Sequence, residues 1–273
     1  MNAIILAGGR IADDLQLDPP VQAKAQILLL GRLMVEYVIE AVRGCAQVER
    51  ICVVAGDWFP ALDAAEKAHH FVPEQGDEAD NLYAALDALD SDQPTVMLAA
   101  DVPLITSEML SQFLDQCPPE ADVVYAFIEK RHILERLGDR RGRSGTTKDG
   151  WVFARVAEGQ FTGGSLFYFR PQALRRAEAL LRQVLEARRH LWRLALIVGP
   201  GLILRALLQQ FLPMRVLSWH DIVRRMGELA KANCVGVASQ QAELAFDVDY
   251  PTDVELAERE LRAQGWQEAA GSA

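Results

Sequence analysis

The first half of the chain alternates apolar segments with amphipathic helical patterns, and this alternation constrains the fold most. Short apolar runs predict strands at 2–7, 50–55, 68–73, 95–100 and 122–128. Patterns with one apolar face predict helices at 33–45, 58–67, 80–90 and 106–116. Near-continuous apolar strands separated by such helices are typical of a mostly parallel sheet that is covered on both faces. The pattern therefore predicts a three-layer α/β/α, Rossmann-like fold around a mixed, mainly parallel sheet.

The second half of the chain is less regular. Residues 129–150 are polar and rich in Arg and Gly, which predicts a long excursion from the sheet. Beyond it, the sequence predicts strands at 151–157, 164–169 and 244–249, a basic helix from 171 to about 190, helices within 200–232, and a last helix at 252–264 capped by Thr252. No linker composition interrupts the chain, so we expect a single domain over 1–273 with a variable region at about 129–235.

One apolar stretch, "LALIVGPGLIL" at residues 194–204, raises the question of whether the chain inserts into a membrane. A spanning helix needs about 20 apolar residues, so this stretch is too short, and the sequence predicts no transmembrane segment. We expect a buried strand, turn and helix here. The alternative is an interfacial patch that contacts lipid or a partner.

Charge and cysteine usage exclude some functions. The net charge of −10 argues against a nucleic-acid partner, because such proteins carry a basic face. An anionic substrate must instead be held by local lysines, backbone N–H groups or a metal ion. The four cysteines are scattered, with no C-x-x-C motif and no clustering with His, which favours a cytoplasmic protein with free thiols. The first residues of the chain are predicted to form a strand and do not resemble a signal peptide.

The first candidate site is the pair Gly8-Gly9 at the end of the first predicted strand. Ligands of parallel sheets bind beyond the carboxyl ends of the strands, and glycines there allow a phosphate to approach the backbone. A simple tight turn is the alternative, since neither the Rossmann nor the P-loop glycine pattern is present. Lys24 is either a solvated lysine or the positive charge that a triphosphate needs at this turn.

Two aspartates could hold a cation. Asp101 directly follows the predicted strand at 95–100, where Mg²⁺ commonly binds through a carboxylate and substrate phosphates. A role in capping the next helix is the alternative, although Thr106 and Ser107 are better placed for it. Strand alternation would put Asp247 and Asp249 on one side, where they could converge with Asp101. Asp253 is expected to be an ordinary acid in the first turn of the last helix.

Four segments in order, "LAGG", "KAQILLLGRLM", "DVPL" and "DVDYPTD", resemble the MobA-like nucleotidyltransferases. The resemblance spans residues 3–128 and 160–264 and implies the nucleotide-diphospho-sugar transferase type of fold. It also implies a set of nucleotide-binding residues, namely Ala7, Gly8, Gly9, Arg10, Lys24, Gly76 and Asn81. By the same resemblance, Asp101 and Asp249 would bind Mg²⁺, and Lys24 and Asp101 would be catalytic.

The segment "TGGS", formed by Thr162, Gly163, Gly164 and Ser165, resembles the acceptor-binding part of that family. Ser165 stands where we would expect Asn, and acidic residues follow Arg10, at Asp13 and Asp14. Relatives occur in several oligomeric states, so an oligomer is compatible with the resemblance.

The resemblance implies Mg²⁺-dependent transfer of a nucleotidyl group from an NTP to a phosphorylated small molecule or lipid, with release of pyrophosphate. Two other functions stay open. The "DVD" at 247–249 superficially fits a metal motif of nucleotide-sugar glycosyltransferases, and the acidic loop suits a degenerate nucleotide-binding or regulatory protein.

Overall fold

The computed structural model describes residues 1–8, 21–138, 151–187, 196–211 and 215–269. Among them, eight strands form one sheet in the order β10-β7-β9-β6-β1-β4-β5, with β8 paired to β9. The strands are β1 (Asn2–Leu6), β4 (Arg50–Ala55), β5 (His70–Pro73), β6 (Thr95–Ala99), β7 (Val123–Glu129), β8 (Ala154–Val156), β9 (Gly159–Phe169) and β10 (Cys234–Ser239). The strand β9 runs antiparallel to β6, β7 and β8, whereas the other pairings are parallel. The predicted mixed, mainly parallel sheet is confirmed.

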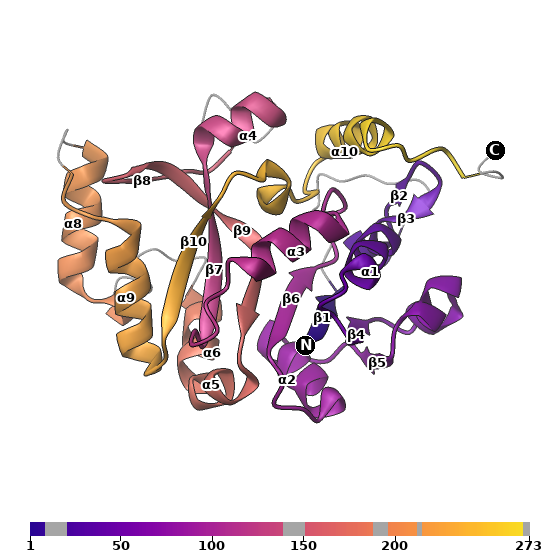
Figure 1. The fold of residues 1–273 in the computed structure, drawn as a ribbon, viewed down its shortest axis with the longest axis horizontal. Coiled ribbons are helices and arrows are strands. Elements are labelled where there is room, and N and C mark those ends of the chain that lie inside the picture. The colour runs from indigo at the N-terminus through magenta and orange to yellow at the C-terminus, as the bar shows by residue number, and fades with distance from the viewer. Residues whose placement is uncertain (9–20, 139–150, 188–195, 212–214, 270–273) are drawn as a thin grey trace.

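Helices cover both faces of the sheet (Figure 1). One face packs against α1 (Met34–Gly44), α3 (Ser107–Asp115) and α10 (Pro251–Ala263). The other packs against α2 (Glu78–Leu89), α5 (Pro171–Arg176) and α6 (Glu178–Ala187). Two more helices, α8 (Pro200–Phe211) and α9 (Trp219–Ala230), lie together at one end of the molecule, beside β10. The three-layer arrangement follows from the apolar strands, which need cover on both sides.

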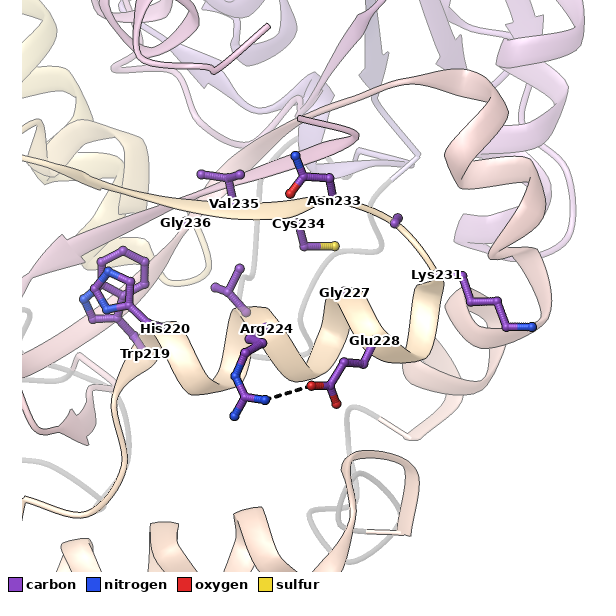
Figure 2. Close-up of a pocket in the computed structure, with 12 residues that line it drawn as sticks. Trp219, His220, Arg224, Gly227, Glu228, Lys231, Asn233, Cys234, Val235 and Gly236 are labelled. Carbon is purple, nitrogen blue, oxygen red and sulfur yellow. Dashed lines mark hydrogen bonds and ion pairs between the residues drawn. The ribbon is translucent and has the colours of Figure 1, made fainter. Parts of the chain in front are cut away.

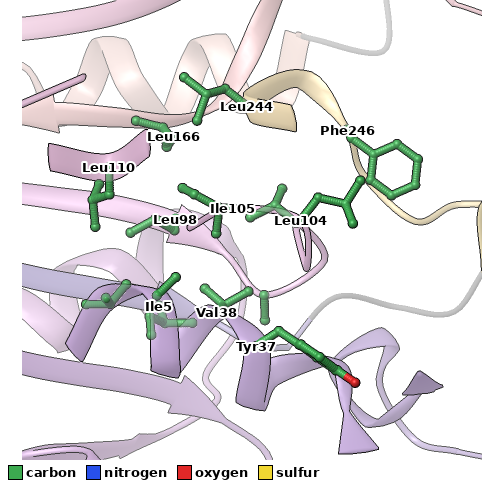
Figure 3. Close-up of a cluster of buried hydrophobic side chains, with 14 of the residues drawn as sticks. Ile5, Tyr37, Val38, Leu98, Leu104, Ile105, Leu110, Leu166, Leu244 and Phe246 are labelled. Carbon is green, nitrogen blue, oxygen red and sulfur yellow. The ribbon is translucent and has the colours of Figure 1, made fainter. Parts of the chain in front are cut away.

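The main core lies between β1, β6, β9 and the α1 side of the sheet (Figure 3). The predicted helical period is confirmed in α1, where Met34, Val38 and Val42 are fully buried on one side. Ile5 and Leu98, from neighbouring strands, complete this contact. A short hairpin of β2 (Leu28–Leu29) and β3 (Arg32–Leu33) leads into α1.

Several predictions for local structure are wrong. Residues 58–67 form two short 3-10 helices, Phe59–Ala61 and Asp63–Lys67, and only Ala154–Val156 of 151–157 is a strand. The basic helix is divided into α5 and α6, and a short helix, α4 (Lys130–Arg136), begins the excursion whose residues 139–150 lie outside the described part. The helix α10 begins with Pro251 after an extended Tyr250, so Thr252 is not its cap.

The last predicted strand is also misplaced. The strand is β10, Cys234–Ser239, whereas residues 242–245 form a 3-10 turn and 246–250 have no regular structure. The sequence pattern missed β10 because its residues are small and weakly alternating. The apolar run at 244–248 is instead buried as an irregular segment, with Leu244, Phe246 and Val248 inside the core.

Residues 196–204, the described part of the apolar stretch, form no strand and are not fully buried. Residues 196–198 and α8 are helical, and the side chains of Leu196, Leu204 and Phe211 are 75%, 58% and 79% exposed. In the part of the chain that the structure describes, no helix has the length and hydropathy needed to cross a bilayer.

Candidate active site

The glycine turn after β1 faces the loop that follows β5. The carboxylate of Glu74 lies so close to Gly8 that a Cβ at Gly8 would overlap it. Both segments leave the sheet at the carboxyl ends of parallel strands, with Ala7 N–H bonded to the Val54 carbonyl at 2.7 Å and Glu74 N–H to the Ala55 carbonyl at 2.8 Å. The absence of a side chain at Gly8 therefore lets the Glu74 carboxylate lie against its backbone.

The loop before α2 is held by its own polar side chains. Asn81 is buried, and its Oδ1 accepts a hydrogen bond from the Gln75 N–H at 2.6 Å. Asp77 caps α2 by accepting from the Asp80 N–H at 2.8 Å, while the Asp80 carboxylate accepts from the Asp77 N–H at 3.1 Å. A Cβ at Gly76 would overlap that Asp80 carboxylate. Asn81 and Gly76 thus shape the loop as well as border the site.

Asp249 lies near Asp101 although it is not on a strand. A backbone hydrogen bond from the neighbouring residue holds it there. The Val248 N–H donates to the Asp101 carbonyl at 3.0 Å, which places residues 247–249 across the end of β6. The carboxylate of Asp253 accepts from the N–H groups of Asp249 and Tyr250, at 2.9 and 2.8 Å. Asp253 lies in the first turn of α10, as predicted, but it is also fully buried and accepts these backbone hydrogen bonds. It holds the turn that presents Asp249.

Lys24 connects the two aspartates. Its ammonium nitrogen lies 3.3 Å from Oδ2 of Asp101 and also contacts Oδ1 of Asp249. The 3-10 turn Lys24–Gln26 that carries it is fixed by Gln26, whose Oε1 accepts from the Gln22 and Ala23 N–H groups. The side chain of Lys24 is only 14% exposed, and those of Asp101 and Asp249 are 21% exposed. Three charged groups from distant parts of the chain therefore meet in a shielded position.

The shielding changes the pKa values of these groups. Burial raises the pKa of Asp101 to about 6, with the charges of Asp247 and Asp249 adding to the effect and Lys24 opposing it. Burial by itself would lower the pKa of Lys24, but the neighbouring carboxylates of Asp101 and Asp249 outweigh it and raise that pKa. Lys24 therefore stays charged at neutral pH, while Asp101 ionises at a cost.

Lys24 and Asp101 line a cavity of about 610 Å³, whereas Asp249 is not part of its lining. The predicted residues that line it are Ala7, Gly8, Lys24, Gly76, Asn81 and Asp101. We call it the nucleotide cavity below, after the predicted nucleotide-binding residues in its lining. Its described lining carries one cation, Lys24, and five carboxylates, those of Glu74, Asp77, Glu78, Asp101 and Glu186. Gly9 and Arg10, also predicted to bind nucleotide, lie outside the described residues.

The predicted acceptor segment lies on β9, beside the end of β6. Leu166 pairs with Leu98, so Ser165, Gly164 and Gly163 continue past β6 toward the level of Asp101. The pairing with β7 shifts register between Tyr125 and Phe127, which makes a bulge at this segment. None of its four residues lines the nucleotide cavity. The structure thus brings the segment near the site without including it in the cavity.

Each glycine of this segment accommodates a close neighbour. A Cβ at Gly163 would overlap the hydroxyl of Tyr125, and one at Gly164 would lie 3.2 Å from the Ala126 Cβ and 3.4 Å from the Leu244 carbonyl. Thr162 pairs with Ile128 on β7.

Sequence reasoning missed the acidic residues of the loop after β5. Glu74, Asp77 and Glu78 follow a parallel strand at the same edge as Gly8, and that position was the signal that could have identified them. A larger cavity of about 740 Å³ lies between α9 and β10 (Figure 2). It contains none of the predicted site residues, and Trp219 and His220 stack at one end of it.

Asp101 and Asp249 are the described residues best suited to a metal ion. Within the described part of the chain, no group of three or more His, Cys, Asp or Glu side chains is arranged around one metal position. The two carboxylates nevertheless converge on a single cation, the ammonium of Lys24. Carboxylate oxygens are the ligands Mg²⁺ prefers, and it usually completes its shell with water and substrate phosphates. The donor set therefore fits such an ion.

Comparison with solved structures supports the fold. A hypothetical transferase from Thermus thermophilus is 28% identical, with a TM-score of 0.78 over 93% of this chain and 98% of its own. A CMP-2-keto-3-deoxy-manno-octonic acid synthetase in complex with CTP is 13% identical, with a TM-score of 0.56 over 97% of this chain and all of its own. A 4-diphosphocytidyl-2C-methyl-D-erythritol synthase from Anaerococcus prevotii is 12% identical, with a TM-score of 0.57 over 96% of this chain and 97% of its own.

The last two likenesses show the fold, which is the Rossmann-like type of the nucleotide-sugar transferases. A search of curated protein sequences found no significant match. The model of the MobA-like NTP transferase domain matches residues 3–216, which is most of the chain. With the glycine turn, Lys24 and Asp101 gathered at one edge of the sheet, the chain belongs to the MobA-like NTP transferase family.

Proposed function

We propose that this protein is a nucleotidyltransferase that moves a nucleotidyl group from an NTP to a phosphate-bearing acceptor. An oxygen of the acceptor phosphate attacks the α-phosphorus of the NTP, the bond to the β-phosphate oxygen breaks, and pyrophosphate leaves. The observation that carries the proposal is the ammonium of Lys24 between the carboxylates of Asp101 and Asp249, at the wall of the nucleotide cavity. Family membership and the fold support it.

The residues of the cavity divide the work of binding. The backbone of Ala7 and Gly8 lies where it can face the base and phosphates, and Gly76 with Asn81 forms the opposite wall. Lys24 can leave its carboxylate partners for the phosphates of an NTP, because the two aspartates then have a metal ion to neutralise them. The acceptor phosphate is already an anion, so positioning and charge neutralisation are sufficient for the attack.

We propose that Mg²⁺ is held by Asp101 and Asp249. When bound, the ion neutralises the charge on the phosphates and on the leaving pyrophosphate. Asp253 supports this arrangement, since it fixes the N–H groups of Asp249 and Tyr250 and so orients the Asp249 carboxylate. The acidic lining of the cavity makes a divalent ion all the more necessary for a polyanionic substrate.

The test is thermal unfolding with ATP, GTP, CTP and UTP, each with and without Mg²⁺. A ligand at roughly 100–1,000 times its Kd stabilises the folded state by about 2.7–4 kcal/mol. We expect one NTP to raise the midpoint only with Mg²⁺, and Asp101→Asn to remove the effect. Asp92→Asn, in an exposed loop outside the cavity, is the matched control and should retain it.

The two alternative functions give different results. Stabilisation by nucleotide-sugars but by no NTP would replace the proposal with a glycosyltransferase. Binding of an NTP with Mg²⁺, but no pyrophosphate release across a panel of phosphorylated small molecules and lipids, would favour a degenerate binding protein.

A further inference from the structure

A second cavity, of about 480 Å³, lies on the acceptor side of the sheet. We call it the basic cavity. It is enclosed by the turn between β8 and β9, the first residues of α4, and the segment after α8. Its charged lining consists of Lys130, Arg131, Arg155, Arg215, Glu129 and Glu158. Four cations and two carboxylates give it the opposite sign to the nucleotide cavity, in a chain whose net charge is −10.

The two carboxylates of the basic cavity are already engaged. Glu129 pairs with Arg131 at 2.8 Å. Glu158 accepts hydrogen bonds from the Ser218 hydroxyl and from the Trp219 N–H, the latter at 3.4 Å. Neither carboxylate is paired with Arg155 or Arg215 in these contacts.

Arg155 and Arg215 are the two groups that an anion would satisfy. Neither makes a hydrogen bond or ion pair with any residue within the described ranges. Both belong to exposed residues that line the same cavity, where an oxyanion could accept hydrogen bonds from either guanidinium group. Guanidinium also matches phosphate and carboxylate geometry, because its planar N–H groups can donate two parallel hydrogen bonds.

The wall that carries Arg215 is held in place by neighbouring elements. Gln209 on α8 is buried, and its Oε1 accepts from the N–H groups of Val216 and Leu217, both at 2.7 Å. The Ala157 N–H then donates to the Leu217 carbonyl at 2.7 Å, which ties the segment to the β8–β9 turn. The backbone on both sides of the cavity is therefore fixed before any ligand binds.

The basic cavity lies along β9 from the predicted acceptor segment, at a distance that one acceptor molecule could span. Extending the pairing of Leu166 with Leu98 brings Gly163 to about the level of Asp101, and the cavity begins at Gln160, three residues away along β9. At about 3.3 Å per residue, the separation is roughly 10 Å. The base side of the nucleotide cavity, at β5 and α2, lies in the other direction across the sheet.

We propose that the basic cavity binds a second anionic group of the acceptor, a phosphate or a carboxylate, through Arg155 and Arg215. This rests on the proposed function, because it takes the reacting phosphate of the acceptor to lie near Asp101. The acceptor is then an elongated molecule with anionic groups at two places about 10 Å apart. The acidic lining of the nucleotide cavity disfavours this second anionic group. Binding in the basic cavity would place the group among cations instead.

The test uses inorganic phosphate as the probe and amide NMR of the full chain as the readout. We expect saturable shifts of the Gln160 and Arg215 amides with a Kd of about 1–10 mM, as for a small ligand with few contacts. The double variant R155Q/R215Q should weaken binding at least about tenfold. Arg224→Gln removes an exposed arginine of α9 that lies outside this cavity, and it should leave the affinity within about twofold.

The same wild-type sample is then titrated with the Mg²⁺ complex of each NTP, with and without phosphate. Phosphate that stays bound when the nucleotide binds supports the proposal, whereas displacement of phosphate by nucleotide would assign it to the nucleotide cavity and overturn the proposal. Unchanged affinity in R155Q/R215Q, or no saturable shift at all, would also overturn it. If no NTP binds but arginine-dependent phosphate binding persists, the proposed function fails and the anion site stands.

Discussion

At the scale of single residues, the surroundings of Asp101 disfavour its ionised carboxylate. Its carboxylate is shielded from water and has Asp247 and Asp249 nearby, and these influences outweigh the attraction of Lys24. Its pKa in the folded protein is about 6, well above its ordinary value of 3.8. An acid whose pKa is raised on folding lowers the free energy of unfolding whenever it is ionised.

Replacing Asp101 by Asn should therefore stabilise the metal-free protein. Each pKa unit corresponds to 1.36 kcal/mol, so we expect a gain in unfolding free energy of about 1–3 kcal/mol at pH 7.5. The gain should be complete above pH 6, where the folded wild type carries the charge, and should shrink as the pH falls from 6 toward 4. Urea denaturation at pH 7.5 and 4.5, with a chelator present, measures it. A loss of stability at pH 7.5 would show that the attraction between Lys24 and Asp101 dominates.

At the scale of elements, α9 depends on glycines for its packing against β10. The indole of Trp219, at the start of α9, lies over Gly236 of β10, and a Cβ there would overlap the ring (Figure 2). On the other side of the helix-to-strand turn, a Cβ at Gly227 would lie 2.8 Å from the Ala232 carbonyl. The helix can approach the edge strand closely because neither position has a side chain.

Gly236→Ala should lower the free energy of unfolding by about 1–3 kcal/mol, because overpacking displaces a buried ring. Gly201→Ala is the control, since a Cβ at Gly201 of α8 meets no atom within 4 Å and alanine favours helix. We expect that variant to be unchanged or slightly more stable. Chemical denaturation followed by tryptophan fluorescence compares the two. Equal stability of both variants would mean that Trp219 moves aside without cost.

At the scale of the whole molecule, charge is unevenly distributed. The chain carries −10 overall, and the described lining of the nucleotide cavity adds five carboxylates to one ammonium. A negatively charged nucleotide therefore approaches against a repulsive field. Added salt screens that field, since the Debye length falls from about 30 Å at 0.01 M to about 8 Å at 0.15 M ionic strength.

The association rate of an NTP with saturating Mg²⁺ should consequently rise with salt. We expect an increase of about 2- to 5-fold between about 20 and 200 mM KCl, whereas a ligand attracted by the field would bind more slowly. Stopped-flow measurements with a fluorescent NTP analogue give the rate. A rate that falls with salt would mean that local cations, not the overall charge, govern the approach.

The sequence by itself determined the layered architecture of this protein. It also determined several of the residues that lie at the carboxyl ends of the strands, where the cavity is. Strands and helices of the first half follow from apolar periodicity, which is a local property, and β4 begins and ends at its predicted residues. The glycine turn and Asp101 were predictable for the same reason: each directly follows a strongly apolar strand, and parallel strands end at one edge.

Only the tertiary structure decided how the second half completes the site. Asp249 reaches Lys24 because an irregular segment is bonded to the Asp101 carbonyl and is held by buried Asp253, not because it lies on a strand. Likewise, β10 is a strand chiefly because β7 offers it a partner, although its own residues are small. Such contacts join residues far apart in the chain, so their energies leave no periodic pattern in the sequence.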